Sequence, residues 1–502
     1  MRNDWRKWTD DLMNEAERAA SNGHMRTVYE VTRMLCNERS TGKVVKDKDC
    51  RVLSSQEERK KRWKEHFEEV LNRPQPSHPL EIDDERDTVE EIDIGPIQKD
   101  EIIKAMKKLK NGKSGGIDGI TAEIMKADME TTIRYLEKLF TTIWNKEVIP
   151  PEWNKGLIVK IRKKGDRSVC DNYRGITLLS MPSKVFSRVV IQRIQEGAEK
   201  QLREEQAGFR KGRSTTEQLF TIRYIIEQCT EWNATLYVNY VDFEKAFDSI
   251  HRDSLWSIMK YYGIPDKLIR MVKLLYDTFD CAVLEDGEES EWFRVTTGVK
   301  QGCTMSGFLF LLVIDFLMKR TTKREPTGIR WNFTTKLEDL DFADDLALLS
   351  SKFQDIQQKT QSLHENASGV GLKINISKTK VMRLNSNIKE QVKIEGKKIE
   401  DVETFTYLGG VVTSKGGCDE DISNRLCKAK TQFRRLRKIW SSSCFSIQTK
   451  IKLFNSLVMS VLTYGSETWK TIERDKKKLD TLQNRCLRQL LRVRWPDKIS
   501  NE

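Results

Sequence analysis

The stretch that decides the fold is LDFADDLALLS, residues 340–350, in which Asp344 and Asp345 stand between two apolar runs. Its pattern predicts a strand, a tight turn that carries both acids, and a second strand. Because side chains alternate between the two faces of a strand, the two acids cannot both point into the core. An unpaired buried carboxylate is very costly. The pair is therefore either an exposed hairpin tip or a set of metal ligands that needs a third carboxylate.

A second stretch supplies that carboxylate. LYVNYV, residues 236–241, predicts a buried strand, and Asp242 follows it directly. Carboxylate oxygens are the protein ligands that hard Mg²⁺ ions prefer. Asp242 and Asp344 are far apart in the sequence, so only the fold can bring them together.

The overall charge indicates a polyanionic partner. The chain has 502 residues, and 88 Lys and Arg against 75 Asp and Glu give a net charge of +13. A basic excess of this size favours nucleic acid over a membrane surface. The most apolar run, residues 308–318, is too short to span a bilayer and contains Asp315. It predicts a buried helix, and we expect no membrane partner.

The cysteine pattern indicates neither a zinc module nor a disulfide-bonded module. None of the ten cysteines forms a Cys-x-x-Cys pair, and the chain has only five histidines, so we expect no zinc module. Scattered cysteines behind a polar amino terminus predict free thiols in a reducing, intracellular compartment.

Three basic segments are candidates for phosphate contact. Residues 157–166 and 172–179 predict two strands joined by a basic loop, and lysines beside such a turn suit a triphosphate. Residues 206–215 form a second basic, glycine-bearing loop before a helix; it could hold an anion or be a capped surface helix. From about residue 419 the pattern is helical, and residues 425–440 carry basic side chains without acids. Since a solvated face usually mixes signs, the third segment favours contact with a nucleic-acid backbone.

Seven motifs stand in the order found in one family of polymerases. They are NYRGI (172–176), QAGFR (206–210), DFEKAFD (242–248), GVKQGC (298–303), FADD (342–345), KT (378–379) and YLG (407–409). With them the chain resembles the reverse transcriptase of non-LTR (LINE-type) retrotransposons over about residues 1–495. Nothing in it resembles the endonuclease domain that precedes this region in the family. Two positions depart from the family pattern: Phe342 replaces a tyrosine, and Gly307 replaces a proline, which should loosen the start of the helix there.

The resemblance implies an α+β fold of the right-hand polymerase type. Such a fold has fingers, a palm with an antiparallel sheet and a helical thumb, here preceded by a helical amino-terminal extension. The boundaries expected are residues 1–95 for the extension and its linker, 96–415 for fingers and palm, and 416–502 for the thumb.

The resemblance also assigns the catalytic centre and its cofactor. Asp242, Asp344 and Asp345 would be the catalytic acids and would hold two Mg²⁺ ions, with Mn²⁺ as the alternative and Asp345 as the weaker ligand. Two such ions would activate the primer 3′-hydroxyl and stabilise the pyrophosphate leaving group. The nucleotide pocket would be formed by Lys163, Arg174, Phe247, Gln301 and Lys378.

Further residues would contact the nucleic acids. The primer grip would consist of Tyr407, Leu408 and Gly409. The basic residues expected to bind nucleic acid are Arg210, Arg213, Arg434 and Arg435.

The function expected from the resemblance is RNA-directed DNA polymerisation from the 3′ end of a DNA primer. Its partners would be template RNA, primer or target DNA and deoxynucleoside triphosphates, and its location the nucleus, with the cytoplasm as the alternative. Two other functions stay open: a catalytically silent relic that binds nucleic acid, and a group II intron-type enzyme. The loop after Lys163 and the amino-terminal helices fit the intron-type enzyme less well.

Overall fold

The structure is a computed structural model of mixed α+β type that describes residues 2–36, 44–82, 92–323, 326–493, 497 and 499–500. The chain forms two compact units. One comprises Met1–Gly42, Thr216–Ala234 and Glu403–Glu502, and the other Lys43–Thr215 and Thr235–Val402. The expected boundaries after residues 95 and 415 differ from the limits of these units, and residues within 2–36 share an apolar core with the carboxy-terminal helices.

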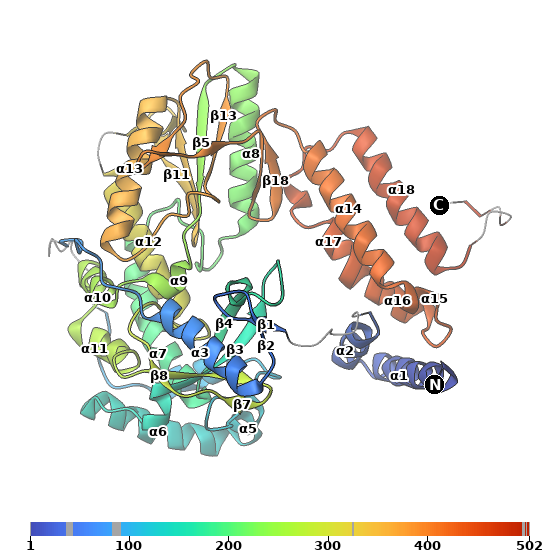
Figure 1. The fold of residues 1–502 in the computed structure, drawn as a ribbon, viewed down its shortest axis with the longest axis horizontal. Coiled ribbons are helices and arrows are strands. Elements are labelled where there is room, and N and C mark those ends of the chain that lie inside the picture. Colours follow the sequence, from blue (N-terminus) through green and yellow to red (C-terminus); the bar gives the residue numbers. More distant parts are fainter. Residues whose placement is uncertain are drawn as a thin grey trace. The chain divides into compact units, whose positions relative to one another are not determined.

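The larger unit contains a five-stranded sheet, in which Figure 1 labels β5, β11 and β13. In spatial order its strands are β11 (Asp339–Phe342), β12 (Asp345–Ser350), β5 (Leu236–Val241), β13 (Lys380–Leu384) and β16 (Glu400–Asp401). All pairs are antiparallel except β13 with β16. Strand β5 lies in the middle and is buried at every position, as its apolar sequence predicts. The sheet thus buries the strand that ends at Asp242.

The predicted strand–turn–strand of residues 340–350 is confirmed with one change. Asp345 is not in the turn but begins β12, paired with Phe342. The turn consists of Ala343, which has a φ of 58°, and Asp344. The two acids therefore leave the hairpin from different backbone positions.

Two long helices pack beside this sheet. They are α12 (Ser306–Thr322) and α13 (Phe353–Gly369), which lie against each other (Figure 1). Every residue from 308 to 318 is buried, so the predicted buried helix is confirmed. Its only charged residue in that run, Asp315, is fully buried and accepts a hydrogen bond from the backbone amide of Arg203 at 3.0 Å.

A second sheet of the same unit contains the predicted basic loop. Strands β3 (Lys155–Arg162) and β4 (Tyr173–Leu178) pair antiparallel, and β6 (Asp280–Glu285) pairs parallel to β3. Helix α3 (Gln56–Leu71) packs on β6 and places Trp63 and Phe67 in the core of this sheet. Its amino terminus is a capping box between Ser55 and Glu58, which satisfies backbone donors on both sides.

The smaller unit is a helical bundle with a hairpin. Helices α1 (Arg2–Ser21) and α2 (Met25–Cys36) share one apolar core with α14 (Asp419–Arg435), α15 (Arg437–Ser441), α16 (Ile447–Phe454) and α18 (Glu473–Leu490). The core includes the stripe from Ile422 to Trp440 that the carboxy-terminal sequence predicts. Helix α8 (Thr215–Glu231) joins this unit through Arg223, which forms an ion pair with the buried Asp421 at 2.8 Å.

Two whole-chain expectations can be compared with the structure. In the ranges that the structure describes, none of the helices combines the length and the apolarity that crossing a bilayer requires. The ten cysteines are free thiols.

Candidate active site

The three expected catalytic acids meet at one end of the central sheet. Strand β12 pairs with β5 through Leu346 and Val241, so Asp345 and Asp242 follow at the same end of two neighbouring strands. Asp344 lies in the turn directly before Asp345. The register of the sheet thus joins carboxylates that the sequence separates.

The electrostatics of this cluster are those of crowded carboxylates. Desolvation raises the pKa of Asp344, and the neighbouring Asp242 raises it further. The pKa of Asp345 is raised to about 6 by partial desolvation and then by Asp344 and Asp242, although part of its surface stays exposed. Mutual repulsion of this kind disfavours the charged forms, and a cation placed among them would relieve it.

Lys378 is the cation that lies nearest to Asp242 in this structure. Its Nζ is 3.2 Å from Asp242 Oδ2. The turn that carries Lys378 is tied to the strand end, because the amide of Asn375 donates to the carbonyl of Asp242 at 2.8 Å and the amide of Asp242 donates to Thr379 Oγ1 at 3.3 Å. The lysine therefore lies at the strand end that carries Asp242.

The donors at this position have the chemistry that a divalent metal needs. Three carboxylates offer hard oxygen ligands, which suit Mg²⁺. Among the described residues, however, no three His, Cys, Asp or Glu side chains are arranged around a common point as metal ligands are. The donor set thus fits Mg²⁺ in type and in strand placement, and the side chains would have to converge around it.

A cavity of about 470 Å³ lies beside the acids and is lined by Asp242 and Asp344. The structure brings all the expected nucleotide-binding residues to its wall: Lys163, Arg174, Phe247, Gln301 and Lys378. They come from separate segments of the larger unit, and no local sequence pattern joins them.

One wall of the cavity is electropositive. The amide of Lys163 donates to the carbonyl of Asn172 at 2.7 Å, and Arg174 lies opposite Ile161 on the paired strands β3 and β4. Burial lowers the pKa of Lys163, and the nearby Arg174 and Lys245 lower it further. Cations that disfavour one another's charge attract an anionic ligand to the same place.

The opposite wall carries an aromatic ring and an amide. Phe247 belongs to α9 (Ala246–Ser249), and its ring stacks on that of Phe310 with the centroids 4.3 Å apart and the planes at 11°. Gln301 Nε2 donates to Asp248 Oδ1 at 2.7 Å. Burial raises the pKa of Asp248 to about 6. Asp248 is thus engaged inside the protein by Gln301.

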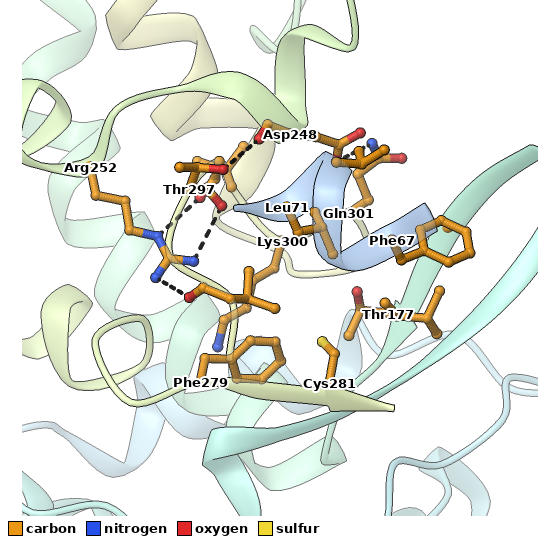
Figure 2. A pocket seen from close by; sticks show the side chains of 16 residues that line it. Phe67, Leu71, Thr177, Asp248, Arg252, Phe279, Cys281, Thr297, Lys300 and Gln301 are labelled. Atoms are coloured by element: carbon orange, nitrogen blue, oxygen red, sulfur yellow. Dashed lines mark hydrogen bonds between the residues drawn. The ribbon is translucent and has the colours of Figure 1, made fainter. Parts of the chain in front are cut away.

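Hydrogen bonds from two buried basic side chains, Arg252 and Lys300, stabilise the loop that carries Gln301. Figure 2 shows a second, small cavity of about 30 Å³ next to this loop, with Arg252 on one side of it. The guanidinium of Arg252 donates to the carbonyls of Tyr276 at 2.7 Å and Val295 at 2.8 Å. The Nζ of the fully buried Lys300 donates to the carbonyl of Leu275, and burial lowers the pKa of this lysine to about 7. These contacts hold the backbone on which Gln301 is mounted.

Three residues of the cavity lie in no motif of the sequence: His66, Phe67 and Val70, which reach it from α3. Phe209, within the QAGFR motif, also lines the cavity, although the sequence predicts no role for it. Burial, with Lys245 nearby, lowers the pKa of His66 to about 4. Only long-range packing brings helix α3 here, and the single local signal is the capping box that starts it.

The expected primer grip lies in the smaller unit. Tyr407 ends β17 (Thr404–Tyr407), and Gly410 begins β18 (Gly410–Thr413). Leu408 and Gly409 form the turn between them with φ values of 47° and 82°, and the hydroxyl of Tyr464 donates to the carbonyl of Leu408 at 2.9 Å. Tyr407 is only 2% exposed, so the surface that this turn offers to a primer comes from Leu408 and Gly409.

The basic residues expected to bind nucleic acid fall into two groups. Arg434 and Arg435 are exposed at the end of α14, and Arg213 forms an ion pair with the exposed Glu204. Arg210, in contrast, is buried by its own loop.

The contacts of Arg210 explain why its side chain is buried. Its guanidinium donates to Glu199 Oε1 at 2.8 Å and to the carbonyls of Gln206 at 3.0 Å and Arg203 at 2.6 Å. Arg210 therefore stabilises the loop and is not available to phosphate. Arg425, inside the basic helix, is also buried, since its guanidinium donates to the carbonyl of Gly409 and lies over the ring of Tyr464.

Known sequences resemble this chain over the region of the site. The sequence model of the reverse transcriptase (RNA-dependent DNA polymerase) family matches residues 161–412, and that of a domain of unknown function matches residues 432–464. The probable RNA-directed DNA polymerase from transposon BS of Drosophila melanogaster is 24% identical over 420 residues, which cover 80% of this chain and 45% of that protein. The probable RNA-directed DNA polymerase from transposon X-element of the same organism is 23% identical over 421 residues, 81% of this chain and 45% of that protein.

The chain is also similar to a third transposon protein and to a solved structure. The transposon TX1 uncharacterized 149 kDa protein of Xenopus laevis is 24% identical over 284 residues, 57% of this chain and 22% of that protein. The chain thus spans less than half the length of these relatives. Among solved structures, a telomerase from Candida albicans superposes with a TM-score of 0.43 and 11% identity over 76% of this chain and 69% of that one.

The segment matched by the family model contains the strand end at Asp242 and the hairpin with Asp344 and Asp345. It also contains all five expected nucleotide-binding residues, of which Lys163 lies nearest to its start. This chain therefore belongs to the reverse transcriptase family and is related to the polymerases of non-LTR retrotransposons.

Proposed function

We propose that this chain is an RNA-directed DNA polymerase that extends the 3′ end of a DNA primer on an RNA template. The observation that carries the proposal is the cavity beside Asp242 and Asp344, into which Lys163, Arg174 and Gln301 also project. A triphosphate needs cations on one side and a metal site on the other, and this cavity offers both chemistries.

The proposed roles follow from the contacts of each side chain. Lys163, directly after β3, and Arg174, on the paired strand β4, would bind the triphosphate of the incoming nucleotide through charge-assisted hydrogen bonds. Phe247 would lie under its sugar, and Gln301, held by Asp248, would lie beside the nucleotide. Lys378, whose Nζ is 3.2 Å from Asp242 Oδ2, would contact the leaving phosphate.

Members of this family use a divalent metal, and the residues that would hold it here are Asp242 and Asp344, with Asp345 as a weaker ligand. Two bound ions would supply Lewis-acid activation of the primer hydroxyl and charge stabilisation at the leaving group. The protein contributes the position of the acids at two neighbouring strand ends and a partly desolvated site that strengthens charge interactions.

Residues of the smaller unit would contact the nucleic acids. Arg434 and Arg435 on α14 present exposed charge suited to phosphates, and Leu408 with Gly409 offers the exposed backbone of a hairpin turn. Template RNA, primer DNA and deoxynucleoside triphosphates are thus the proposed partners, with the nucleus as the proposed place of action.

A primer-extension assay tests the proposal. Purified protein is given an RNA template, an annealed DNA primer, the four deoxynucleoside triphosphates and Mg²⁺. Extension that depends on Mg²⁺ and is absent from Asp344→Ala supports it. If the wild-type protein binds the template–primer duplex but does not extend it under Mg²⁺ or Mn²⁺, the chain is instead a silent relic that binds nucleic acid.

A further inference from the structure

Phe209 is an aromatic residue of the cavity to which the proposed function assigns no role. Its side chain is 51% exposed and lines the cavity together with Asp344 and Phe247. Its backbone has a φ of 55°, a left-handed conformation that a bulky residue rarely adopts. Strain of this kind persists only where the surrounding structure holds the residue in place.

The segment before Phe209 is attached to the catalytic hairpin. The amide of Ala207 donates to the carbonyl of Asp341 at 2.9 Å. The side-chain oxygen of the fully buried Gln206 accepts hydrogen bonds from the amides of Gly208 at 2.8 Å and Ala343 at 3.2 Å. A Cβ at position 208 would lie 2.2 Å from the nitrogen of Ala343, so the approach of the two backbones requires glycine there.

The residue after Phe209 closes the loop. The buried guanidinium of Arg210 donates to the carbonyl of Gln206 at 3.0 Å and to Glu199 Oε1 at 2.8 Å. Phe209 is therefore held between a residue bonded to the hairpin of Asp344 and a residue bonded to its own loop. The backbone from which its ring projects is thus fixed next to the turn that contains Asp344.

The ring of Phe209 contacts the ring proposed to lie under the sugar. The centroids of Phe209 and Phe247 are 5.9 Å apart at an interplanar angle of 73°, an edge-to-face contact. The ring of Phe247 is stacked on Phe310 at 4.3 Å. Phe247 is thus held by one neighbour against its face and by another at an edge-to-face angle, and both geometries are favourable for aromatic pairs.

Gly307 makes room for this arrangement. A Cβ at position 307 would lie 2.7 Å from Cδ1 and 3.0 Å from Cε1 of Phe209. Gly307 lies in the first turn of α12, three residues before Phe310. Any larger residue at 307 would have to displace the ring of Phe209.

We propose that Phe209 is a positioning residue for sugar selection: it fixes the ring of Phe247 and so sets how strongly the site rejects a ribonucleotide. This inference rests on the proposed function and adds to it the residue pair Phe209 and Gly307. A 2′-hydroxyl would have to enter the space that the Phe247 ring fills, and the ring excludes it only while it cannot turn aside. Removing the edge-to-face neighbour frees that movement.

The experiment compares kcat/KM for dGTP and rGTP opposite cytidine in the template. Phe209→Ala should lower the dGTP/rGTP ratio about three- to tenfold, the range expected for loss of one aromatic pair. Gly307→Ala, which leaves all three rings in the chain but pushes Phe209 aside, should lower the ratio in the same direction. Phe333→Ala, which removes a fully exposed ring of the same unit, is the matched control and should leave the ratio unchanged.

A double variant separates positioning through Phe247 from an independent effect. If Phe209 acts through Phe247, then Phe209→Ala should change the ratio little in a Phe247→Ala background. A purely structural role for Phe209 would lower the melting temperature and the use of both nucleotides together, and the ratio would stay constant. A ratio within twofold of wild type in both Phe209→Ala and Gly307→Ala, or full additivity with Phe247→Ala, overturns the inference.

Failure of the proposed function would look different. If wild-type protein extends no primer, equilibrium titration of the protein–template–primer complex with dGTP and rGTP gives the same comparison without chemistry. A preference for dGTP in binding that Phe209→Ala and Gly307→Ala reduce supports the inference even then. Equal binding ratios in wild type and both variants refute it.

Discussion

Nη1 of Arg203 donates to both carboxylate oxygens of Asp339, at 2.8 and 2.9 Å, at a fully buried position of the strand that leads to Asp344. Nη2 of the same guanidinium donates to Asp341, two residues further along β11. The amide of Arg203 donates to Asp315 of α12 at 3.0 Å. One cation therefore links three buried acids and joins the catalytic hairpin to the central helix.

This network predicts an asymmetric response to mutation. Arg203→Met leaves Asp315, Asp339 and Asp341 buried without their main counterion and should destabilise the protein by about 3–5 kcal/mol. Asp341→Asn is the matched variant. Burial, with Asp339 nearby, raises the pKa of Asp341 well above its ordinary value although Arg203 opposes this shift, so a neutral amide that can still accept from Arg203 should cost less than the loss of the guanidinium.

Melting temperatures distinguish the Arg203→Met variant from the Asp341→Asn variant. We expect Arg203→Met to lower the melting temperature by about 5 °C or more and Asp341→Asn to change it little. Equal losses in both variants would show that the folded protein depends on the carboxylate of Asp341 as much as on the guanidinium of Arg203.

The catalytic acids should be needed for chemistry and not for binding. Asp242→Ala or Asp344→Ala removes a proposed metal ligand, which supplies several kcal/mol of transition-state stabilisation, so primer extension should fall at least about a hundredfold. Binding of a template–primer duplex, measured by filter retention, should stay within about twofold. Asp253→Ala, which removes an exposed acid of α10 (Arg252–Tyr261), is the control. Extension at the wild-type rate in Asp344→Ala would exclude the site assignment.

The exposed basic end of α14 should contribute to the salt dependence of binding. If Arg434 and Arg435 each neutralise one phosphate, replacing both with Gln should reduce the slope of log K against log salt on duplex DNA by about 1.8. The control replaces Lys397 and Lys398, which are exposed on a hairpin of the larger unit. A slope that changes equally in both double variants would mean that the effect follows net charge and not this face.

The stacked ring of Phe247 should select the sugar. Phe247→Ala opens the space under the nucleotide, so the ratio of kcat/KM for dGTP to that for rGTP should fall more than about threefold. Loss of the stack on Phe310 should also lower the stability by about 3 kcal/mol, which thermal melting reports separately. If activity and stability fall but the ratio stays constant, Phe247 is only a packing residue.

Local pattern predicted the elements that carry the chemistry, and the family resemblance joined them. The strand predicted at residues 236–241 has the bounds of β5, because a strand buried on both faces has a largely apolar sequence. The hairpin at residues 340–350 was predicted with its turn one residue too long, since Asp345 already pairs with Phe342. The meeting of Asp242 with this hairpin depends on sheet register, which nothing in either stretch encodes alone.

The differences between prediction and structure concern side chains that bond inside the protein and helices that pack against distant segments. Arg210 and Arg425 have basic side chains in basic segments, and composition alone cannot tell a phosphate ligand from an arginine that binds backbone carbonyls. Arg203 carries no motif, because its three acids come from positions more than a hundred residues later. Likewise, helices α1 and α2 pack with the carboxy-terminal bundle because their apolar stripe fits that core, and sequence order placed them with the extension instead.

The last prediction concerns the pH dependence of stability at Asp248. Burial raises the pKa of this carboxyl from 3.8 to about 6 in the folded protein. The folded state therefore binds the proton more tightly than the unfolded chain, and the free energy of unfolding falls as the pH rises from about 4 to about 6. Asp248→Asn keeps an oxygen that can accept from Gln301 Nε2 but does not titrate. The variant should become more stable than wild type over this window, by up to about 3 kcal/mol, with no further gain above pH 6. Melting temperatures of both proteins between pH 4.5 and pH 8 test this, with Asp253→Asn, at a side chain 79% exposed, as the control. Parallel pH profiles for wild type and Asp248→Asn would show that the carboxyl titrates normally in the folded state.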